Sequence, residues 1–277
     1  MSDERKPPAT ARSFLFVPGD RPERLGKALG SGANAVIVDL EDAVAADAKA
    51  SARDAISHAW HALGAEAHAR LLVRINAVGS PWHEADLAAV RALHGLGGIV
   101  LPKADSVTSA EAVAQAAGTP VVPLIETALG YDAIDFVARA HGVLRLAFGH
   151  LDFQADTGMS CEADERELDA VRLQFVLASR RAGLPAPVDG ITPQLDDAAR
   201  LAADTARSRR FGFGGKLCIH PKQVAAVNEG LAATPAQRAW AQRVLDAAAQ
   251  LGSGALRLDG EMIDAPVLQR ARRFLAQ

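Results

Sequence analysis

The chain has 277 residues, 49% of them hydrophobic, which is enough to bury one large core in a single α/β domain. Its net charge of −3 and pI of about 6.2 give no reason to expect a nucleic-acid partner. The two cysteines, Cys161 and Cys218, lie far apart and match neither a disulfide framework nor a zinc-binding spacing, so we expect a cytoplasmic protein.

Segments that would bring the chain to a membrane are not evident. Residues 1–10 are charged and contain proline but no apolar centre, so we do not expect a signal peptide. No apolar run approaches the roughly 18 residues that a membrane span requires. We therefore expect no membrane partner.

Short apolar runs alternate with amphipathic helical patterns along most of the chain. The runs that predict strands are residues 13–19, 35–41, 70–76, 98–103, 121–127, 145–152, 186–191 and 216–220. The patterns that predict helices between them include residues 21–30, 47–63, 82–93, 107–117, 134–140, 164–181 and 193–207. This alternation predicts parallel strands, and eight units predict a closed (β/α)₈ TIM barrel. A doubly wound open sheet is the alternative, because a single sequence does not reveal strand order.

The pattern changes after residue 220. Two more helices are predicted at residues 221–230 and 234–249, then a break at 252–254, a turn or ribbon at 256–260 and a last helix after Asp264. We assign residues 1–230 to the barrel. Residues 231–277 form a C-terminal helical extension that we expect to cover the active site of its own or a neighbouring subunit.

Polar residues stand where most of the predicted strands end. They are Asp20 with Arg21, Asp39 with Glu41 and Asp42, Arg74 with Asn76, and then Lys103, Glu126, Asp152 and His220. A barrel brings the C-terminal ends of its strands to one face, and barrel enzymes have their active sites there. The sequence therefore predicts one catalytic face built from these side chains.

Glu126 and Asp152 are the strongest candidates for metal ligands. If their runs are neighbouring parallel strands, about 4.8 Å apart, the two carboxylates stand side by side and repel each other unless a proton or a cation lies between them. Mg²⁺ favours one or two carboxylates, with water and substrate as its other ligands. We predict a Mg²⁺ site at this pair. The alternative is two carboxylates that pair with Arg or Lys at the rim.

Seven segments resemble, in the same order, the citrate lyase beta-subunit-like acyl-CoA lyases of the HpcH/HpaI aldolase superfamily. They are residues 12–19, 38–44, 73–76, 101–103, 125–130, 214–223 and 260–266. The resemblance implies a TIM barrel, Mg²⁺, and a homotrimer or a hexamer of trimers. It also implies an enzyme that cleaves or forms a carbon–carbon bond between an acyl-CoA and a 2-oxo acid.

The resemblance also suggests roles for individual residues. The family's metal ligands fall on Glu126 and Asp152, and its arginine for the substrate carboxylate and carbonyl falls on Arg74. An acidic pair expected to bind metal-bound water falls on Glu41 and Asp42. The proton-transferring aspartate of the tail, often donated to a neighbouring subunit, falls on Asp264.

Several alternatives stay open. Arg74 can instead be a structural ion-pair partner of Glu41, and Asp264 can be the N-cap of the last helix. Coenzyme A carries phosphates, so cationic groups near the rim are expected to bind it, and Arg21 and Lys27 are weak candidates. Many relatives have Gly-x-Glu-Asp at residues 149–152, where this chain has Gly-His-Leu-Asp, which leaves the oxo-acid specificity open.

The function that we expect is a Mg²⁺-dependent lyase of the citryl-CoA or malyl-CoA type. A metal-dependent aldolase on free 2-oxo or hydroxy acids, a malyl-CoA thioesterase and a non-catalytic subunit of a larger lyase are the alternatives. Dependence on coenzyme A distinguishes the first two, and Mg²⁺ binding distinguishes the last.

Overall fold

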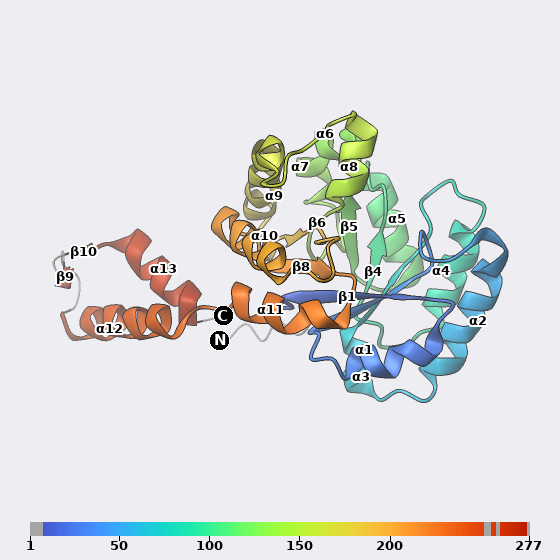
Figure 1. Cartoon of the computed structure of the whole chain (residues 1–277), viewed down its shortest axis with the longest axis horizontal. Coiled ribbons are helices and arrows are strands. Elements are labelled where there is room, and N and C mark those ends of the chain that lie inside the picture. The colour runs from blue at the N-terminus through green and yellow to red at the C-terminus, as the bar shows by residue number, and fades with distance from the viewer. Residues whose placement is uncertain (1–7, 252–255, 259–260, 276–277) are drawn as a thin grey trace. The chain divides into compact units, whose positions relative to one another are not determined.

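The computed structural model describes residues 8–251, 256–258 and 261–275. The chain divides into two compact units, Met1–Leu231 and Ala232–Gln277, which we describe separately (Figure 1). None of the helices in the described part of the chain is long and apolar enough to cross a membrane.

The first unit is a closed barrel of parallel strands in the order β1 to β8 (Figure 1). The strands are β1 Ser13–Pro18, β2 Ala35–Asp39, β3 Leu71–Arg74, β4 Gly98–Leu101, β5 Val121–Ile125, β6 Ala147–Phe148, β7 Val188–Asp189 and β8 Gly215–Cys218. Each lies within or next to a predicted strand, and β8 pairs with β1 to close the ring. The prediction of a TIM barrel is confirmed, and the open doubly wound sheet is wrong.

Helices connect the strands around the outside of the barrel (Figure 1). They are η1 Pro22–Arg24, α1 Leu25–Leu29, η2 Ala46–Ala48, α2 Lys49–Trp60, α3 Ala65–Arg70, α4 His83–Arg91, α5 Val107–Ala117, α6 Ala128–Asp132, α7 Ile134–Val137, α8 His150–Thr157, η3 Arg166–Leu168, α9 Asp169–Arg181, α10 Ala198–Phe211 and α11 Pro221–Leu231. The predicted helices are present, α5 with the predicted ends and the others with shifted ends, whereas α3, α6 and α8 were not predicted.

Side chains alternate between the barrel interior and the layer under the helices, as the period of two along a strand requires. Ile37, Leu72 and Leu124 belong to the interior cluster, and Val36, Val38 and Val73 belong to the outer one. Asp39, Arg74 and Glu126 each lie two residues after one of the interior residues Ile37, Leu72 and Leu124. The alternation therefore directs these three polar side chains into the mouth of the barrel at the C-terminal ends of the strands.

The predicted sixth strand is wrong at its C-terminal end. It was expected to run to Asp152, but β6 ends at Phe148 and Asp152 lies in the first turn of α8. Gly149 separates the two elements. Ile125 of β5 pairs in parallel with Phe148 of β6. The segment that carries Asp152 therefore follows the strand next to the one that Glu126 follows.

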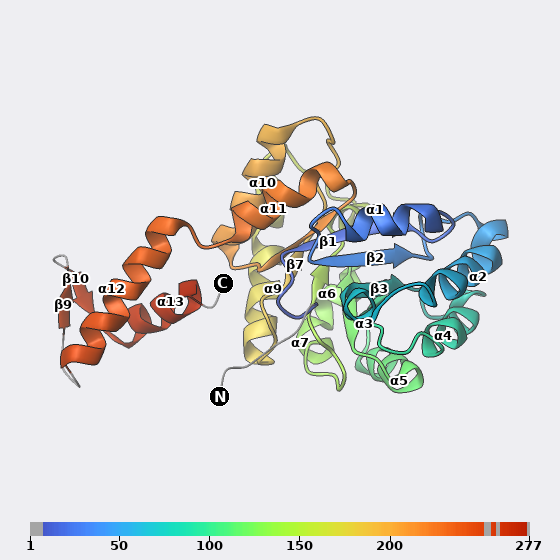
Figure 2. The same cartoon turned by 90° about the horizontal axis from the view of Figure 1, so that it is seen from below.

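The second unit contains α12 Pro235–Leu251, α13 Ala265–Leu275 and the antiparallel pair β9 Leu256–Leu258 and β10 Glu261–Ile263 (Figure 2). Its two helices pack around Ala241, Val244 and Ala271, with the Trp240 and Phe274 rings 6.0 Å apart. β9 lies in residues 256–260, where the sequence predicted a turn or ribbon, whereas β10 lies beyond that range. The expected break at residues 252–254 lies outside the described residues.

Candidate active site

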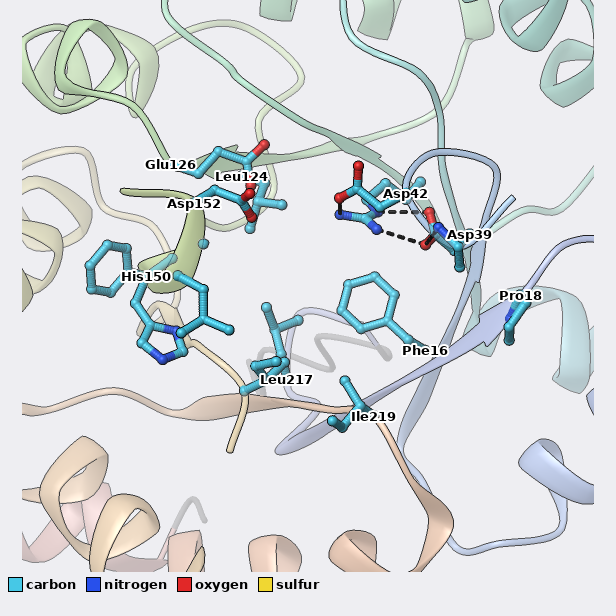
Figure 3. A pocket seen from close by; sticks show the side chains of 16 residues that line it. Phe16, Pro18, Asp39, Asp42, Leu124, Glu126, His150, Asp152, Leu217 and Ile219 are labelled. Atoms are coloured by element: carbon cyan, nitrogen blue, oxygen red, sulfur yellow. Dashed lines mark hydrogen bonds and ion pairs between the residues drawn. The ribbon is translucent and has the colours of Figure 1, made fainter. Parts of the chain in front are cut away.

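A cavity of about 400 Å³ opens at the C-terminal ends of the strands (Figure 3). Its ionisable lining residues are Asp39, Asp42, Arg74, Glu126, His150 and Asp152, and its remaining lining is apolar or glycine. The strand ends thus bring together polar residues that are far apart in the sequence.

Glu126 follows β5 directly, and only 2% of it is exposed. Its Oε1 accepts a hydrogen bond of 2.9 Å from the Lys103 backbone N–H, whereas its buried Oε2 has no hydrogen-bond partner. Gly149 packs against this carboxylate, because a Cβ at residue 149 would lie 2.5 Å from Oε2. The glycine therefore lets β6 pass close to Glu126, and Oε2 is available to coordinate a cation.

Asp152 is exposed in the first turn of α8, where the partial positive charge of the helix N-terminus favours a carboxylate. Within the described part of the chain, neither Asp152 nor Glu126 forms a salt bridge, so the predicted alternative of two acids locked to basic partners does not hold. Figure 3 shows the two side chains next to each other.

Burial raises the pKa of Glu126 to about 8, and the neighbouring charges of Glu41 and Asp152 contribute to the rise. Among the described residues, no group of three or more His, Cys, Asp and Glu side chains is arranged to hold a metal. Two carboxylates with water and substrate completing the shell fit Mg²⁺, which seldom has an all-protein cage. The donor set therefore fits a hard divalent cation.

Arg74 ends β3 and is 8% exposed. Its Nε and Nη2 donate to the two Asp39 oxygens at 2.7 and 2.6 Å, and its Nη1 lies 3.1 Å from Glu41 Oε2 and 3.3 Å from Asp42 Oδ2. Burial lowers the pKa of Arg74, but the hydrogen bonds and charge of Asp39 outweigh it, so the net shift is upward. The ion pair with Glu41 is therefore present, and Arg74 lines the cavity as well.

Glu41 and Asp42 follow β2 and differ in exposure. Glu41 is buried, accepts a 3.1 Å hydrogen bond from Lys103 Nζ, and has a raised pKa, chiefly because of burial. Asp42 is exposed and lines the cavity. Lys49 holds this loop, because its Nζ donates to the Leu40 and Glu41 carbonyl oxygens at 2.7 Å each. Sequence reasoning missed that role, although a lysine eight residues after Glu41 was a signal for it.

The other predicted residues lie elsewhere. Arg21 and Lys27 are exposed at η1 and α1, and neither lines the cavity. Asp264 belongs to the second unit, where its Oδ1 accepts a 3.1 Å hydrogen bond from the Val267 N–H, so it is the N-cap of α13. Its catalytic role and the coenzyme A contacts of Arg21 and Lys27 stay predictions.

His150 and Leu151 depart from the family pattern in different ways. The His150 ring points away from Glu126 and Asp152 (Figure 3), and its Nε2 lies 3.7 Å from Glu165 Oε1. Burial lowers the pKa of His150 to about 4, so the ring is neutral at pH 7. Leu151 lines the cavity and is 43% exposed.

Residues 12–221 match the model of the HpcH/HpaI aldolase/citrate lyase family. The chain belongs to this family. A citrate lyase subunit beta-like protein of Deinococcus radiodurans is 38% identical over 281 residues, which cover 98% of each chain. A (3S)-malyl-CoA thioesterase of Cereibacter sphaeroides is 32% identical over 272 residues, covering 96% of this chain and 94% of that protein.

A solved family member has the same fold. The crystal structure of protein CitE from Mycobacterium tuberculosis, in complex with magnesium, acetoacetate and coenzyme A, superimposes with a TM-score of 0.83 at 33% identity. The match covers 97% of this chain and 98% of that one. The family that the sequence motifs indicated is thereby confirmed.

Proposed function

We propose that this protein is a Mg²⁺-dependent carbon–carbon lyase that splits a 3-hydroxyacyl-CoA into an acyl-CoA and a 2-oxo acid, or forms it from them. The observation that supports this most strongly is the carboxylate pair of Glu126 and Asp152, with one buried oxygen lacking a partner, in a cavity that Arg74 also lines. A family member that binds magnesium and coenzyme A supports the same assignment.

Glu126 and Asp152 would hold the Mg²⁺ ion, which when bound supplies Lewis acidity to a substrate carbonyl. Arg74 would bind the substrate carboxylate or the oxygen that becomes charged in cleavage. Its planar guanidinium is oriented by the two hydrogen bonds to Asp39, which a lysine would not reproduce. Glu41 and Asp42 would orient water at the metal site.

Asp264 is our candidate for the acid or base that moves a proton at the α-carbon of the acyl group, in its own or a neighbouring subunit. Because Asp264 is also the N-cap of α13, the test must separate proton transfer from helix capping. Asn caps a helix about as well as Asp but does not exchange a proton at neutral pH. We expect Asp264→Asn and Asp264→Ala both to lose turnover and to keep Mg²⁺ binding. Loss in the Ala variant alone would assign Asp264 to capping.

The assembly and location complete the proposal. We keep the prediction of a homotrimer or a hexamer of trimers in the cytoplasm, with Arg21 and Lys27 as candidate contacts for coenzyme A phosphates. Sedimentation of the purified protein tests the oligomeric state, and a Lys27→Glu variant with a raised KM for the acyl-CoA and an unchanged kcat would support the phosphate contact.

The decisive experiment measures turnover of a panel of 3-hydroxyacyl-CoAs with and without Mg²⁺. The lyase assignment predicts that an acyl-CoA and a 2-oxo acid appear in equal amounts and only with the metal. Turnover of the same hydroxy acids without coenzyme A would instead support a metal-dependent aldolase. No turnover and no calorimetric Mg²⁺ binding would support a non-catalytic subunit.

A thioesterase is the second candidate, because one similar protein is a (3S)-malyl-CoA thioesterase. Water would then attack the thioester carbonyl, and the products would be free coenzyme A and the intact hydroxy acid. Release of a free thiol without a 2-oxo acid, measured in the same assay, would identify this reaction.

A further inference from the structure

The cavity has an acidic side and an apolar side. Figure 3 shows Glu126, Asp152 and Asp42 along one side, and Phe16, Leu217 and Ile219 along the other. Leu151 and Ile191 also line the cavity, and Leu124 lies beside Glu126 (Figure 3). Apart from His150 and a glycine, every uncharged lining residue is apolar.

Charge is distributed unevenly in the same cavity. Its lining contains four carboxylates, those of Asp39, Asp42, Glu126 and Asp152, and among the described lining residues Arg74 is the one cation. Arg74 already contacts Asp39, Glu41 and Asp42. The His150 ring points away from Glu126 and Asp152 (Figure 3), and its Nε2 lies 3.7 Å from Glu165 Oε1.

A bound 2-oxo acid presents one carboxylate next to its carbonyl, and the metal and Arg74 suffice for that group. A second carboxylate would face either apolar side chains or further carboxylates. An unpaired charge in such surroundings is strongly disfavoured. An alkyl group in the same place would be stabilised, by about four-fold in affinity for each methylene that it buries.

From this distribution we propose that the 2-oxo acid of this enzyme is a monocarboxylate with a short alkyl substituent, and not a dicarboxylate. The inference rests on the proposed lyase function and specifies its substrate class. Leu151 is the specificity-determining residue that we single out, since it directly precedes Asp152, lines the cavity and is 43% exposed.

Two probes form a matched pair for the test. 2-Oxobutanoate and oxaloacetate differ in having a methyl or a carboxylate at the same position. With saturating Mg²⁺, we expect calorimetry to give at least about 100-fold tighter binding of 2-oxobutanoate. Pyruvate should lie about four-fold below 2-oxobutanoate. The kcat/KM of condensation with acetyl-CoA should follow the same order.

A substitution that supplies a cation beside the cavity should narrow this preference. Leu151→Arg should improve oxaloacetate binding by about ten-fold or more, because a guanidinium pairs well with a carboxylate. Leu195→Arg is the matched control, because Leu195 is also 43% exposed but does not line the cavity. It should leave both affinities unchanged.

The outcomes separate the inference from the proposed function. Turnover with a preference for oxaloacetate overturns the inference and keeps the lyase. Mg²⁺-dependent binding that prefers 2-oxobutanoate, without turnover, supports the inference and removes the lyase. Absence of binding of any 2-oxo acid overturns both, and equal gains in the two arginine variants overturn the role of Leu151.

Discussion

Two regions of the barrel concentrate charged side chains, and they differ in how completely the charges are paired. In the first, between β7, β8, α9 and α10, Arg172 donates to Glu165 and Asp189, and Lys216 Nζ donates to the Gly190 carbonyl at 2.7 Å. Arg207 also contacts Glu165, at 2.9 Å. In this network the carboxylates face cations or hydrogen-bond donors.

The second region is the acidic group at the cavity, where five carboxylates face two cations. The carboxylates are Asp39, Glu41, Asp42, Glu126 and Asp152, and the cations are Arg74 and Lys103. The pKa values reflect the difference. Burial alone would raise the pKa of Asp189, but Arg172 and Lys216 outweigh it and lower this pKa to about 2, whereas the pKa of Glu126 rises to about 8. We therefore expect the paired network to stabilise the fold, and Glu126 and Asp152, which form no salt bridge among the described residues, remain our proposed cation site.

Removal of a metal ligand should have the largest effect. Asp152→Asn and Glu126→Gln should each lower kcat/KM by at least about 10³-fold, since the Lewis acid contributes several kcal/mol to catalysis. Calorimetry should find no Mg²⁺ binding in either variant. Asp132→Asn changes an exposed acid of α6 outside the cavity and serves as the control. Normal turnover in Asp152→Asn would disprove the metal site.

Breaking the paired network should affect stability and not metal binding. Asp189→Asn removes the negative charge that faces buried Arg172 and Lys216 and leaves Arg172 with Glu165 alone, and we expect a loss of about 3 kcal/mol in the free energy of unfolding in urea. Because the folded pKa of Asp189 is below its unfolded value, its contribution is present above about pH 4 and is lost as pH falls through about 2. A variant as stable as the wild type would show that the network is dispensable.

The raised pKa of Glu126 predicts a pH dependence that distinguishes the two regions. Mg²⁺ must displace the proton that Glu126 holds below about pH 8, so the affinity should rise about ten-fold per pH unit up to that value and then level off. Calorimetry at pH 6, 7 and 9 measures this slope, which should persist in Asp189→Asn. A flat profile would mean that Glu126 is already ionised in the metal-free protein.

An exposed ion pair outside both regions should have the smallest effect. Arg181 bridges both Asp135 oxygens at 2.8 and 2.9 Å, but 41% of its side chain is exposed. Solvent screens such pairs, so Arg181→Ala should cost about 0.5 kcal/mol of stability and leave kinetics unchanged. A loss of stability as large as that of Asp189→Asn would show that burial does not determine how much an ion pair stabilises this protein.

The sequence by itself predicted the strand and helix alternation and the polar residues at the strand ends, whereas closure into a barrel stayed open between two folds until the strand order was known. Apolar periodicity is local, so a run such as residues 121–127 predicts β5 without knowledge of its neighbours. Alternation along the strands likewise directs Arg74 and Glu126 into the mouth once their interior neighbours are known. The family motifs then matched these same positions.

Only the tertiary structure decided which charges are paired. Arg74 and Asp39 are 35 residues apart, and Lys103 and Glu41 are 62 apart, so neither pair has a local signal. The sequence also did not determine where α8 starts, at His150, or that Gly149 packs against Glu126. Both features depend on β5 lying beside β6. Whether a carboxylate is paired with a cationic side chain or is left able to bind a metal ion depends on its neighbours in space. Tertiary packing determines which residues become those neighbours.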